Sequence, residues 1–257
     1  MCSIIIFCYV QNNVLVVTQV EYENQLIPAS FNNYKIVQLS DLHGKSFGYE
    51  QSRLLRQVEE LKPDLIVLTG DLIDSKKSSE GAYELVKRIS VIAPTYFVSG
   101  NHEAWSSSYQ TLISALEDAQ VTLLNNEAVQ IKRGEEQITL LGVNDPSFGT
   151  DVDEVLKAHE VNTFQILLSH RPELFEMYIN RSMDLVFAGH AHGGQFRLPF
   201  IGNGLIAPDQ GLFPKYSEGL HTKKGTTMVV SRGLGNSIVP LRLFNQPEIV
   251  CVTLRGN

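Results

Sequence analysis

Residues 64–71 of the chain read DLIVLTGD, a short apolar run that stops at a glycine and an aspartate. Four other segments follow the same pattern: residues 35–43 (KIVQLSDLH), 94–103 (PTYFVSGNHE), 164–170 (FQILLSH) and 183–192 (MDLVFAGHAH). Short β-branched runs of this kind predict strands that are buried on both faces. Because ligands bind at the carboxyl ends of strands in open α/β sheets, we expect the polar residues after these runs to meet at one sheet edge.

The polar residues at these strand ends are two aspartates, one asparagine and five of the seven histidines. Imidazole and carboxylate groups suit Mn, Fe and Zn, whereas an all-oxygen set would suit Mg or Ca. A glycine precedes the ligand in three segments, at Gly70, Gly100 and Gly189, and lets the backbone approach an ion with no side chain in the way. The set offers enough donors for two metal ions, which points to metal-assisted hydrolysis.

The composition excludes some partners. The chain has 257 residues, 43% of them hydrophobic, with a formal net charge of -7. It can bury a large core, and it has no block of Lys and Arg of the kind that binds a phosphate backbone. We therefore expect no long nucleic acid as a partner, whereas a short phosphorylated substrate is compatible with this balance. The three cysteines give no disulfide framework.

The order of the other elements indicates two mixed sheets that face each other, with helices outside. Helical patterns that end before Pro63 and Pro94 connect the first strands, which is the signature of right-handed parallel crossovers. In the second half, a turn at Gly134 predicts a hairpin. The expected helices are residues 49–61, 80–92, 107–119 and a short one after Pro172, and the further expected strands are residues 127–132, 137–143, 226–231 and 248–254.

Residues 1–33 are expected to form a leader in front of a main domain of residues 34–257. Within it, residues 14–20 predict a β-strand. Residues 3–10 are apolar but far shorter than the ~20 residues that a membrane-spanning helix needs. They are interpreted as a short β-strand or a disordered start, or else as the remnant of a membrane anchor. The protein is expected to be cytoplasmic or membrane-associated, with peripheral membrane contact.

Residues 193–225 are rich in Gly and Pro and show no clear periodicity. An irregular segment of this length is usually functional or a misassigned element. We interpret it as a substrate-facing loop in which His221 could approach the site; the alternative is a pair of short hairpins that bury its apolar side chains. Those side chains are Phe196, Leu198, Phe200, Ile201, Leu205, Ile206, Leu212 and Phe213.

The five motifs resemble those of the calcineurin-like metallophosphoesterase superfamily, whose pattern is D-x-H, G-D, G-N-H-[ED], a lone H and G-H-x-H. The run GHAHGGQ at 189–195 and SRGLG at 231–235 are similar to a subgroup of bacterial membrane-associated phosphodiesterases, which includes enzymes similar to UDP-diacylglucosamine pyrophosphatases. The resemblance implies a metal-dependent phosphoric ester hydrolase with an α/β fold, a four-layer α/β/β/α sandwich of two mixed sheets. The pattern is matched at Asp41/His43, Gly70-Asp71, Gly100-Asn101-His102-Glu103, His170 and Gly189-His190-Ala191-His192.

The resemblance also implies two divalent metal ions, with Mn expected and Fe or Zn as alternatives. Asp71 would bridge them, because two cations ~3.5–4 Å apart repel each other and need negative charge between them. The implied reaction is in-line attack on phosphorus by a hydroxide held between the ions, so Asp71 counts as catalytic. Asp41, His43 and His192 would hold one ion, and Asn101, His170 and His190 the other.

Four residues are expected to contact the substrate or the reacting atoms. His102 is expected to protonate the leaving oxygen or to stabilise the transition state. Asn101 leaves the site net positive for a phosphate, because its carbonyl is neutral. Glu103 is expected to orient His102 or contact substrate, or else to be a solvated or helix-N-terminal charge. Arg232 is expected to bind a phosphate bidentately, with a structural ion pair as the alternative.

The expected function is hydrolysis of phosphodiester or pyrophosphate bonds in a phosphorylated small molecule or a lipid-linked substrate. The apolar residues after His192 and at the start of the chain favour a lipid-like or membrane-proximal substrate. The alternative is a phosphomonoesterase or nucleotide phosphodiesterase with a soluble substrate, because loops and not the metal ligands select the leaving group. A non-catalytic scaffold would lack ligands or His102, which this chain retains.

Overall fold

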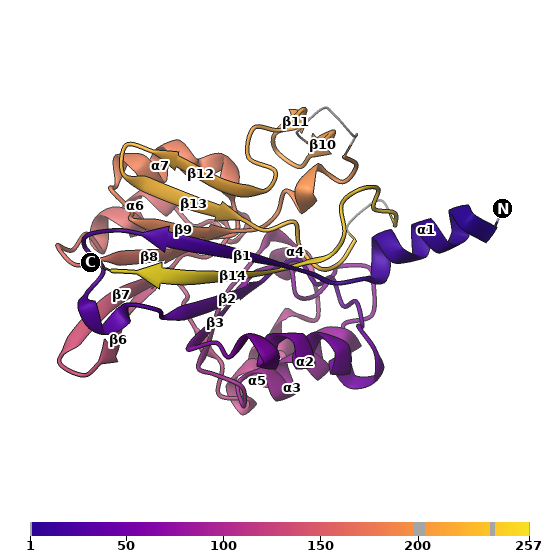
Figure 1. Cartoon of the computed structure of the whole chain (residues 1–257), viewed down its shortest axis with the longest axis horizontal. Helices are drawn as coiled ribbons and strands as arrows, with labels where there is room; N and C mark the ends of the chain where they lie inside the picture. The colour runs from indigo at the N-terminus through magenta and orange to yellow at the C-terminus, as the bar shows by residue number, and fades with distance from the viewer. Residues whose placement is uncertain (1, 198–203, 237–239, 257) are drawn as a thin grey trace.

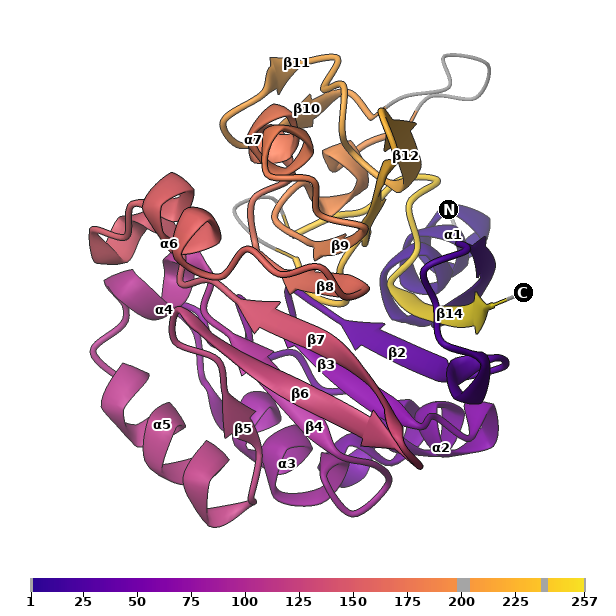
Figure 2. The same cartoon turned by 90° about the vertical axis from the view of Figure 1, so that its left-hand side faces the viewer.

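Two six-stranded mixed sheets lie face to face, with helices covering the outer face of each (Figures 1 and 2). The structure is a computed structural model that describes residues 2–197, 204–236 and 240–256. This arrangement is the four-layer α/β/β/α sandwich that the sequence predicts. Figure 2 shows the hairpin of the second sheet in front of the strands of the first.

The first sheet holds the strands that end in the first three motifs. Its four strands from β2 to β5 are parallel, β14 is antiparallel to β2, and β1 is parallel to β14. The strand order is β1 (Val16–Glu23), β14 (Glu248–Arg255), β2 (Lys35–Leu39), β3 (Leu65–Thr69), β4 (Thr95–Val98) and β5 (Thr122–Leu123). The covering helices are α2 (Ser52–Leu61), α3 (Glu80–Ile89) and α5 (Tyr109–Asp118). The three predicted crossover helices are therefore confirmed.

The second sheet carries the last two motifs. Its middle strands β7, β8, β9 and β13 are parallel, while the two edge strands, β6 and β12, pair antiparallel with their neighbours. The strand order is β12 (Gly219–Lys223), β13 (Thr226–Val230), β9 (Leu185–Ala188), β8 (Gln165–Leu168), β7 (Glu136–Gly142) and β6 (Glu127–Arg133). Helices α6 (Val152–Ala158) and α7 (Phe175–Asn180) cover its outer face. The predicted hairpin at Gly134 is confirmed.

Three apolar layers hold the sandwich together. The middle layer lies between the sheets and includes Ile36, Leu65 and Phe187, all fully buried. The outer layers lie between each sheet and its helices, around Leu85 on one side and Tyr178 on the other. Burial on both faces explains why the central strands read as continuous apolar runs.

The N-terminal residues form a helix, α1 (Cys2–Asn13), so the expectation of a short strand or a disordered start is wrong. A strand here would need a partner for its backbone groups, whereas a helix satisfies them internally. The expected strand at residues 14–20 is β1, and it pairs with β14 over its whole length. Among the described residues, no helix is both long and apolar enough to cross a membrane. The proposed division of the chain at residue 34 stays a prediction.

The irregular segment contains a small hairpin of β10 (Ile206–Ala207) and β11 (Gly211–Leu212), while β12 pairs with β13. The hairpin alternative is therefore right about shape but wrong about burial, because Ile206, Leu212 and Phe213 are exposed. The expected apolar residues Leu198, Phe200 and Ile201 lie outside the described residues.

Candidate dinuclear metal centre

All five motifs meet at the carboxyl edges of the two sheets. Asp41 follows β2, Asp71 follows β3, and Asn101 follows β4, each within three residues of the strand end. His170 follows β8 and His190 follows β9 in the same way, each two residues beyond the strand. The two sheets present these ends to each other, so donors from both halves of the chain form one buried cluster.

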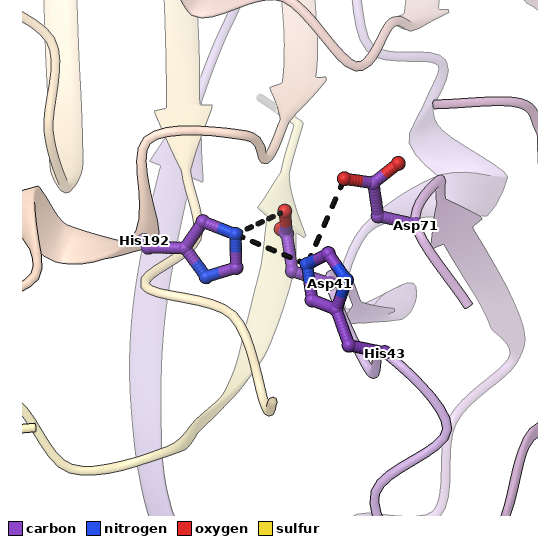
Figure 3. A group of neighbouring side chains, drawn as sticks. All are labelled: Asp41, His43, Asp71 and His192. Atoms are coloured by element: carbon purple, nitrogen blue, oxygen red, sulfur yellow. Dashed lines mark hydrogen bonds and ion pairs between the residues drawn. The ribbon is translucent and has the colours of Figure 1, made fainter. Parts of the chain in front are cut away.

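The first donor group consists of Asp41, His43, Asp71 and His192, whose ligand atoms lie within 4.8 Å of one another. Figure 3 shows the two imidazoles and the two carboxylates pointing toward a common centre. His43 Nε2 is 3.1 Å from His192 Nε2 and 3.7 Å from Asp71 Oδ2. His192 Nε2 is 3.4 Å from Asp41 Oδ1. Two imidazoles and two carboxylates in this geometry suit a transition-metal dication.

The second donor group shares Asp71 with the first and adds His170 and His190. His170 Nε2 is 3.4 Å from Asp71 Oδ2 and 3.2 Å from His190 Nδ1. Asn101 lines the same pocket, and among the described residues its buried Oδ1 has no hydrogen-bond partner. A buried acceptor without a partner is rare and calls for a bound water or ion. The residues present therefore fit two metal ions, and Asp71 belongs to both donor groups.

The backbone at these positions is unusual. Five of the seven expected ligands have φ in the left-handed region, which non-glycine residues rarely adopt. Such strained backbone clusters at functional sites, where the surrounding fold holds it in place. The five residues are Asp41 (φ 53°), His43 (φ 49°), Asp71 (φ 53°), His190 (φ 64°) and His192 (φ 49°).

The glycines before the ligands have a more specific role than the sequence suggests. Gly70 has φ +88°, and a Cβ there would lie 2.7 Å from His170 Nδ1. A Cβ on Gly189 would lie 2.5 Å from Asp41 Oδ2. In both cases a ligand side chain from another strand takes part of this space, together with Gly100 N beside Gly70 and Ser40 Oγ beside Gly189. The glycines allow neighbouring ligand loops to pack against each other, not only an ion to approach.

Two contacts orient the imidazoles. His170 Nδ1 donates to the carbonyl oxygen of Thr69 at 2.7 Å, which leaves Nε2 directed at Asp71. Asp74 Oδ2 lies 3.2 Å from His43 Nδ1 and 3.7 Å from His102 Nδ1. The sequence reasoning missed Asp74, although its place three residues after Asp71 in GDLID was a usable signal. Asp74 therefore connects an expected ligand with the expected catalytic histidine.

Glu103 takes one of the roles considered for it, that of a charge at a helix N-terminus. Its carboxylate is fully buried and accepts backbone N–H groups of Asp71 (2.7 Å), Gly100 (2.7 Å) and Ile73 (3.2 Å). Burial and then the Asp71 charge raise the pKa of Glu103 to about 7, although the three donors favour its ionised form. The expectations of a solvated charge and of substrate contact are wrong. Glu103 is a charge at a helix N-terminus that fixes the Asp71 loop.

A second missed group comes from the irregular segment. Asp209, in the turn of the β10–β11 hairpin, lies 2.8 Å from His190 Nε2 through Oδ2 and forms an ion pair with Arg171. The hydrogen bond to His190, helped by the charge of Arg171 and opposed by burial, lowers the pKa of Asp209 to about 2. Arg171 in turn binds Asp145 bidentately, at 2.5 and 3.0 Å. No motif marks Asp209, and only Arg171, next to His170, had a positional signal.

Arg232 and His221 were expected to bind a phosphate or to approach the site, and each has other contacts. Arg232 Nη2 is 3.1 Å from Glu248 Oε1, and Arg232 Nε is 3.6 Å from Glu218 Oε2. The structural ion pair considered for Arg232 is therefore confirmed. His221 lies on β12, where its Nε2 is 3.0 Å from the carbonyl oxygen of Glu218 and its ring packs against Tyr216.

The charges of the cluster favour a cation. Burial alone would lower the pKa of His170, but the Asp71 carboxylate outweighs it and raises the pKa to about 10. Burial, followed by His43 and Arg242, holds the pKa of His192 well below its ordinary value. Burial also lowers the pKa of His102, although Asp71 and Asp74 oppose this shift. The buried Asp71 charge thus attracts positive charge, while His192 stays in the neutral form that binds metal.

The donor groups open into a pocket of about 180 Å³. Donor residues from both sheets form its base, while α4 (Asn101–Trp105) and the β10–β11 turn contribute the rest. His102 therefore faces the same space as the expected metal ligands. The lining residues are Asp71, Asn101, His102, Trp105, His190, His192, Pro208 and Asp209.

Comparison with known proteins agrees with this geometry. The model of the calcineurin-like phosphoesterase family matches residues 34–194. Metallophosphoesterase YkuE of Bacillus subtilis (strain 168) is 30% identical, over 96% of this chain and 88% of its own length. Phosphodiesterase YaeI of Escherichia coli (strain K12) is 30% identical, over 86% of this chain and 82% of its own length. A transmembrane protein with metallophosphoesterase domain from Danio rerio is 30% identical over 93% of this chain, which spans only 57% of that protein.

Solved structures show the same fold at low identity. The protein TT1561 of Thermus thermophilus matches with a TM-score of 0.52 at 14% identity, covering 78% of this chain and 90% of that one. A dimetal phosphatase from Danio rerio matches with a TM-score of 0.50 at 14% identity, covering 79% and 88%. These likenesses concern the fold alone and confirm the expected sandwich.

Proposed function

Because the chain belongs to the calcineurin-like phosphoesterase family and is a metal-dependent phosphoric ester hydrolase, we propose that it cleaves phosphodiester or pyrophosphate bonds at this cluster. The observation that carries the proposal is the position of Asp71, which belongs to both donor groups. A carboxylate shared in this way is what two neighbouring dications require. The unpartnered Asn101 Oδ1 supports a ligand role for that amide.

We assign the donors as two sets joined by Asp71. Two divalent ions, when bound, would activate a water at neutral pH and stabilise charge on the phosphoryl oxygens. Manganese is our first choice because carboxylate, carbonyl and imidazole donors occur together, with Fe and Zn as alternatives. Asp41, His43 and His192 form one set, and Asn101, His170 and His190 form the other.

His102 is our candidate for the proton donor to the leaving oxygen. It lines the pocket but belongs to neither donor group that shares Asp71. Its Nδ1 lies 3.7 Å from Asp74 Oδ2, so the charge of this carboxylate favours the protonated ring that a proton donor needs. His102 N also donates to Asp71 Oδ1 at 2.8 Å. This hydrogen bond fixes the donor loop relative to the shared carboxylate.

The first experiment measures metal content and Mn²⁺-dependent hydrolysis of bis-p-nitrophenyl phosphate and p-nitrophenyl phosphate. We expect about two metal ions per chain, loss of activity after chelation, and faster cleavage of the diester. Faster cleavage of the monoester would favour the alternative, a phosphomonoesterase. A purified chain that binds no metal would contradict the proposal.

We further propose that the substrate is lipid-linked or membrane-proximal and that α1 makes the peripheral membrane contact. Helix α1 projects from one end of the molecule (Figure 1), and Ile4, Ile5, Ile6 and Tyr9 on it are exposed. Its base is fixed, because Asn12 Oδ1 accepts hydrogen bonds from Asn236 Nδ2 and Arg242 N, both at 3.0 Å. An apolar helix held in this way can insert its tip into a lipid surface.

The test is co-sedimentation with phosphatidylglycerol vesicles. We expect the wild-type chain to sediment with the vesicles and an Ile4→Ser/Ile5→Ser variant to stay in the supernatant, with unchanged cleavage of the soluble diester. Val91→Ser is the matched control, because Val91 is an exposed aliphatic residue far along the chain, beyond α3. Equal sedimentation of all three proteins would contradict the membrane contact.

A further inference from the structure

Trp105 is a large apolar side chain that the fold does not use in a core. It is the only tryptophan of the chain, it ends helix α4, and it is 60% exposed. Its ring centroid lies 5.3 Å from that of His102, with 51° between the planes. An indole held beside the candidate proton donor and left open to solvent is better placed to meet a ligand than to stabilise the fold.

The pocket is too small for a whole substrate of ordinary size. Its volume of about 180 Å³ is below the roughly 300–1,000 Å³ of typical ligand sites. A phosphoryl group at the shared Asp71 would take up the inner part of this space. The rest of the substrate must then lie at the mouth, where Trp105 and Pro208 are the apolar lining residues.

The chemistry of the mouth restricts the leaving group. Among the described residues that line this pocket, none is Lys or Arg. The carboxylate at the mouth, Asp209, is held by His190 and Arg171. An anionic leaving group would meet no lining cation there, because Arg171 behind Asp209 is already paired with Asp145 and Asp209. A neutral ring would instead meet two apolar side chains. Aromatic rings favour stacked or edge-to-face contacts with an indole beyond the simple burial of area.

We propose that Trp105 binds a flat, neutral ring of the leaving group, so that the substrate is a phosphodiester with an aryl or heteroaromatic ester. The inference rests on the proposed function, in which His102 protonates the leaving oxygen. Because the His102 and Trp105 rings are in contact, a group attached to that oxygen lies against the indole. Trp105 is thus a specificity residue, and His102 acts on the bond that joins the ring to phosphorus.

Because Trp105 is the only tryptophan, its fluorescence reports ligand binding in the absence of hydrolysis. Phenylphosphonate, hexylphosphonate and methylphosphonate are titrated into the Zn²⁺-loaded protein, because they bind a metal centre but carry no bond to hydrolyse. We expect phenylphosphonate to shift the emission of Trp105 and to protect it from acrylamide quenching. By calorimetry it should bind about 2- to 10-fold more tightly than methylphosphonate, as expected for one aromatic contact.

Two variants separate stacking from structural effects. Trp105→Leu should bind phenylphosphonate and methylphosphonate equally, and Trp105→Phe should keep most of the preference. Tyr49→Leu is the control, since Tyr49 is an exposed aromatic residue elsewhere on the surface. Zinc content and thermal unfolding of each variant show whether the centre and the fold are intact.

Three results would overturn the inference. Equal binding of phenylphosphonate and methylphosphonate to the wild type, together with cleavage of bis-p-nitrophenyl phosphate, would exclude stacking and leave the proposed function in place. Hexylphosphonate binding as tightly as phenylphosphonate, with both weakened equally in Trp105→Leu, would show a general apolar wall. Absence of any phosphonate binding and of diester cleavage by the metal-loaded protein would overturn the proposed function itself.

Discussion

The base and the mouth of the pocket are built in opposite ways. The base, which we define as the seven expected metal ligands, is buried throughout, and its members follow the ends of five strands. The mouth, which we define as Trp105, Pro208 and Asp209, comes from the short helix α4 and the turn of the β10–β11 hairpin. Trp105 there is 60% exposed, and the side chain of Asp209 is 54% exposed. The sheets fix the position of the base, whereas connecting segments carry the mouth.

The difference separates the residues that carry out the reaction from those that select the substrate. Base residues have strained backbone, as at Asp41 and Asp71. Hydrogen bonds fix the loops that carry them, as Glu103 does for the Asp71 loop. Their positions leave little freedom, so they suit a reaction that needs precise donors. Mouth residues lie on connecting segments, which vary without disturbing the sheets. We therefore expect changes in the base to abolish activity and changes in the mouth to redirect or weaken it.

The largest effect is expected at the centre of the base. Asp71→Asn keeps the shape but removes the charge that both donor groups share. We expect the variant to lose bound metal and to lose more than the about 10³-fold in kcat that removal of one electrostatic donor costs. Metal content and bis-p-nitrophenyl phosphate hydrolysis measure both. Retention of two ions with normal kcat would show that Asp71 is not the shared ligand.

A His102→Ala variant tests whether His102, next to the base of the pocket, contributes to catalysis without binding metal. His102→Ala should keep both metal ions, because its ring belongs to neither group that shares Asp71. We expect kcat to fall by about 10²–10⁴-fold, the usual contribution of a positioned proton donor. The loss should shrink for diesters whose leaving group is a better anion, such as a dinitrophenolate. An equal loss for all leaving groups would assign His102 to transition-state binding and not to proton transfer.

The same division explains what could be predicted from the sequence. Base residues were found because each lies within four residues of the end of a buried strand, so the apolar run and the ligand after it are read together. Asp71 and His170 illustrate this: the runs before them predict the strands, and the facing edges of the two sheets bring Asp71 Oδ2 to 3.4 Å from His170 Nε2. The sandwich followed from the same runs. The sequence pattern therefore predicts where a side chain lies wherever the end of a strand places it.

The sequence was misleading where partners come from distant loops. For Glu103 the sequence left several roles open, because nothing local shows that the loop after β3 turns the N–H groups of Asp71 and Ile73 toward its carboxylate. Asp209 lies in a segment without periodicity, and only the folded hairpin brings it to His190. The expectation of a strand at the start of the chain was wrong for a related reason: a strand needs a partner, and among the described residues the edge strand β1 pairs only with β14, while residues 2–13 form a helix.

Asp209 lies at the mouth and contacts His190 in the base, so its substitution should have an intermediate effect, on metal affinity. Asp209→Asn removes the charge that accepts from His190 Nε2 while its size is kept. We expect the affinity for one of the two metal ions to fall by about 10–100-fold, the usual cost of losing a carboxylate behind a ligand histidine. Competition titration against a metal chelator measures this, with Asp118→Asn as the control. Unchanged affinity would mean that Asp209 only positions the hairpin.

The smallest effect on catalysis is expected at Arg232, which the motif-like SRGLG run suggested as a phosphate ligand. Its guanidinium pairs with Glu248 and Glu218, and Glu248 Oε2 also accepts from Arg232 N at 2.9 Å. Arg232→Gln should therefore lower the free energy of unfolding by about 1.5–3 kcal/mol, as for lost bonds to a charged group. Metal content, kcat and KM should stay unchanged. A raised KM with normal stability would instead move Arg232 to the mouth of the pocket, and the division between base and mouth would then need a third, cationic, part.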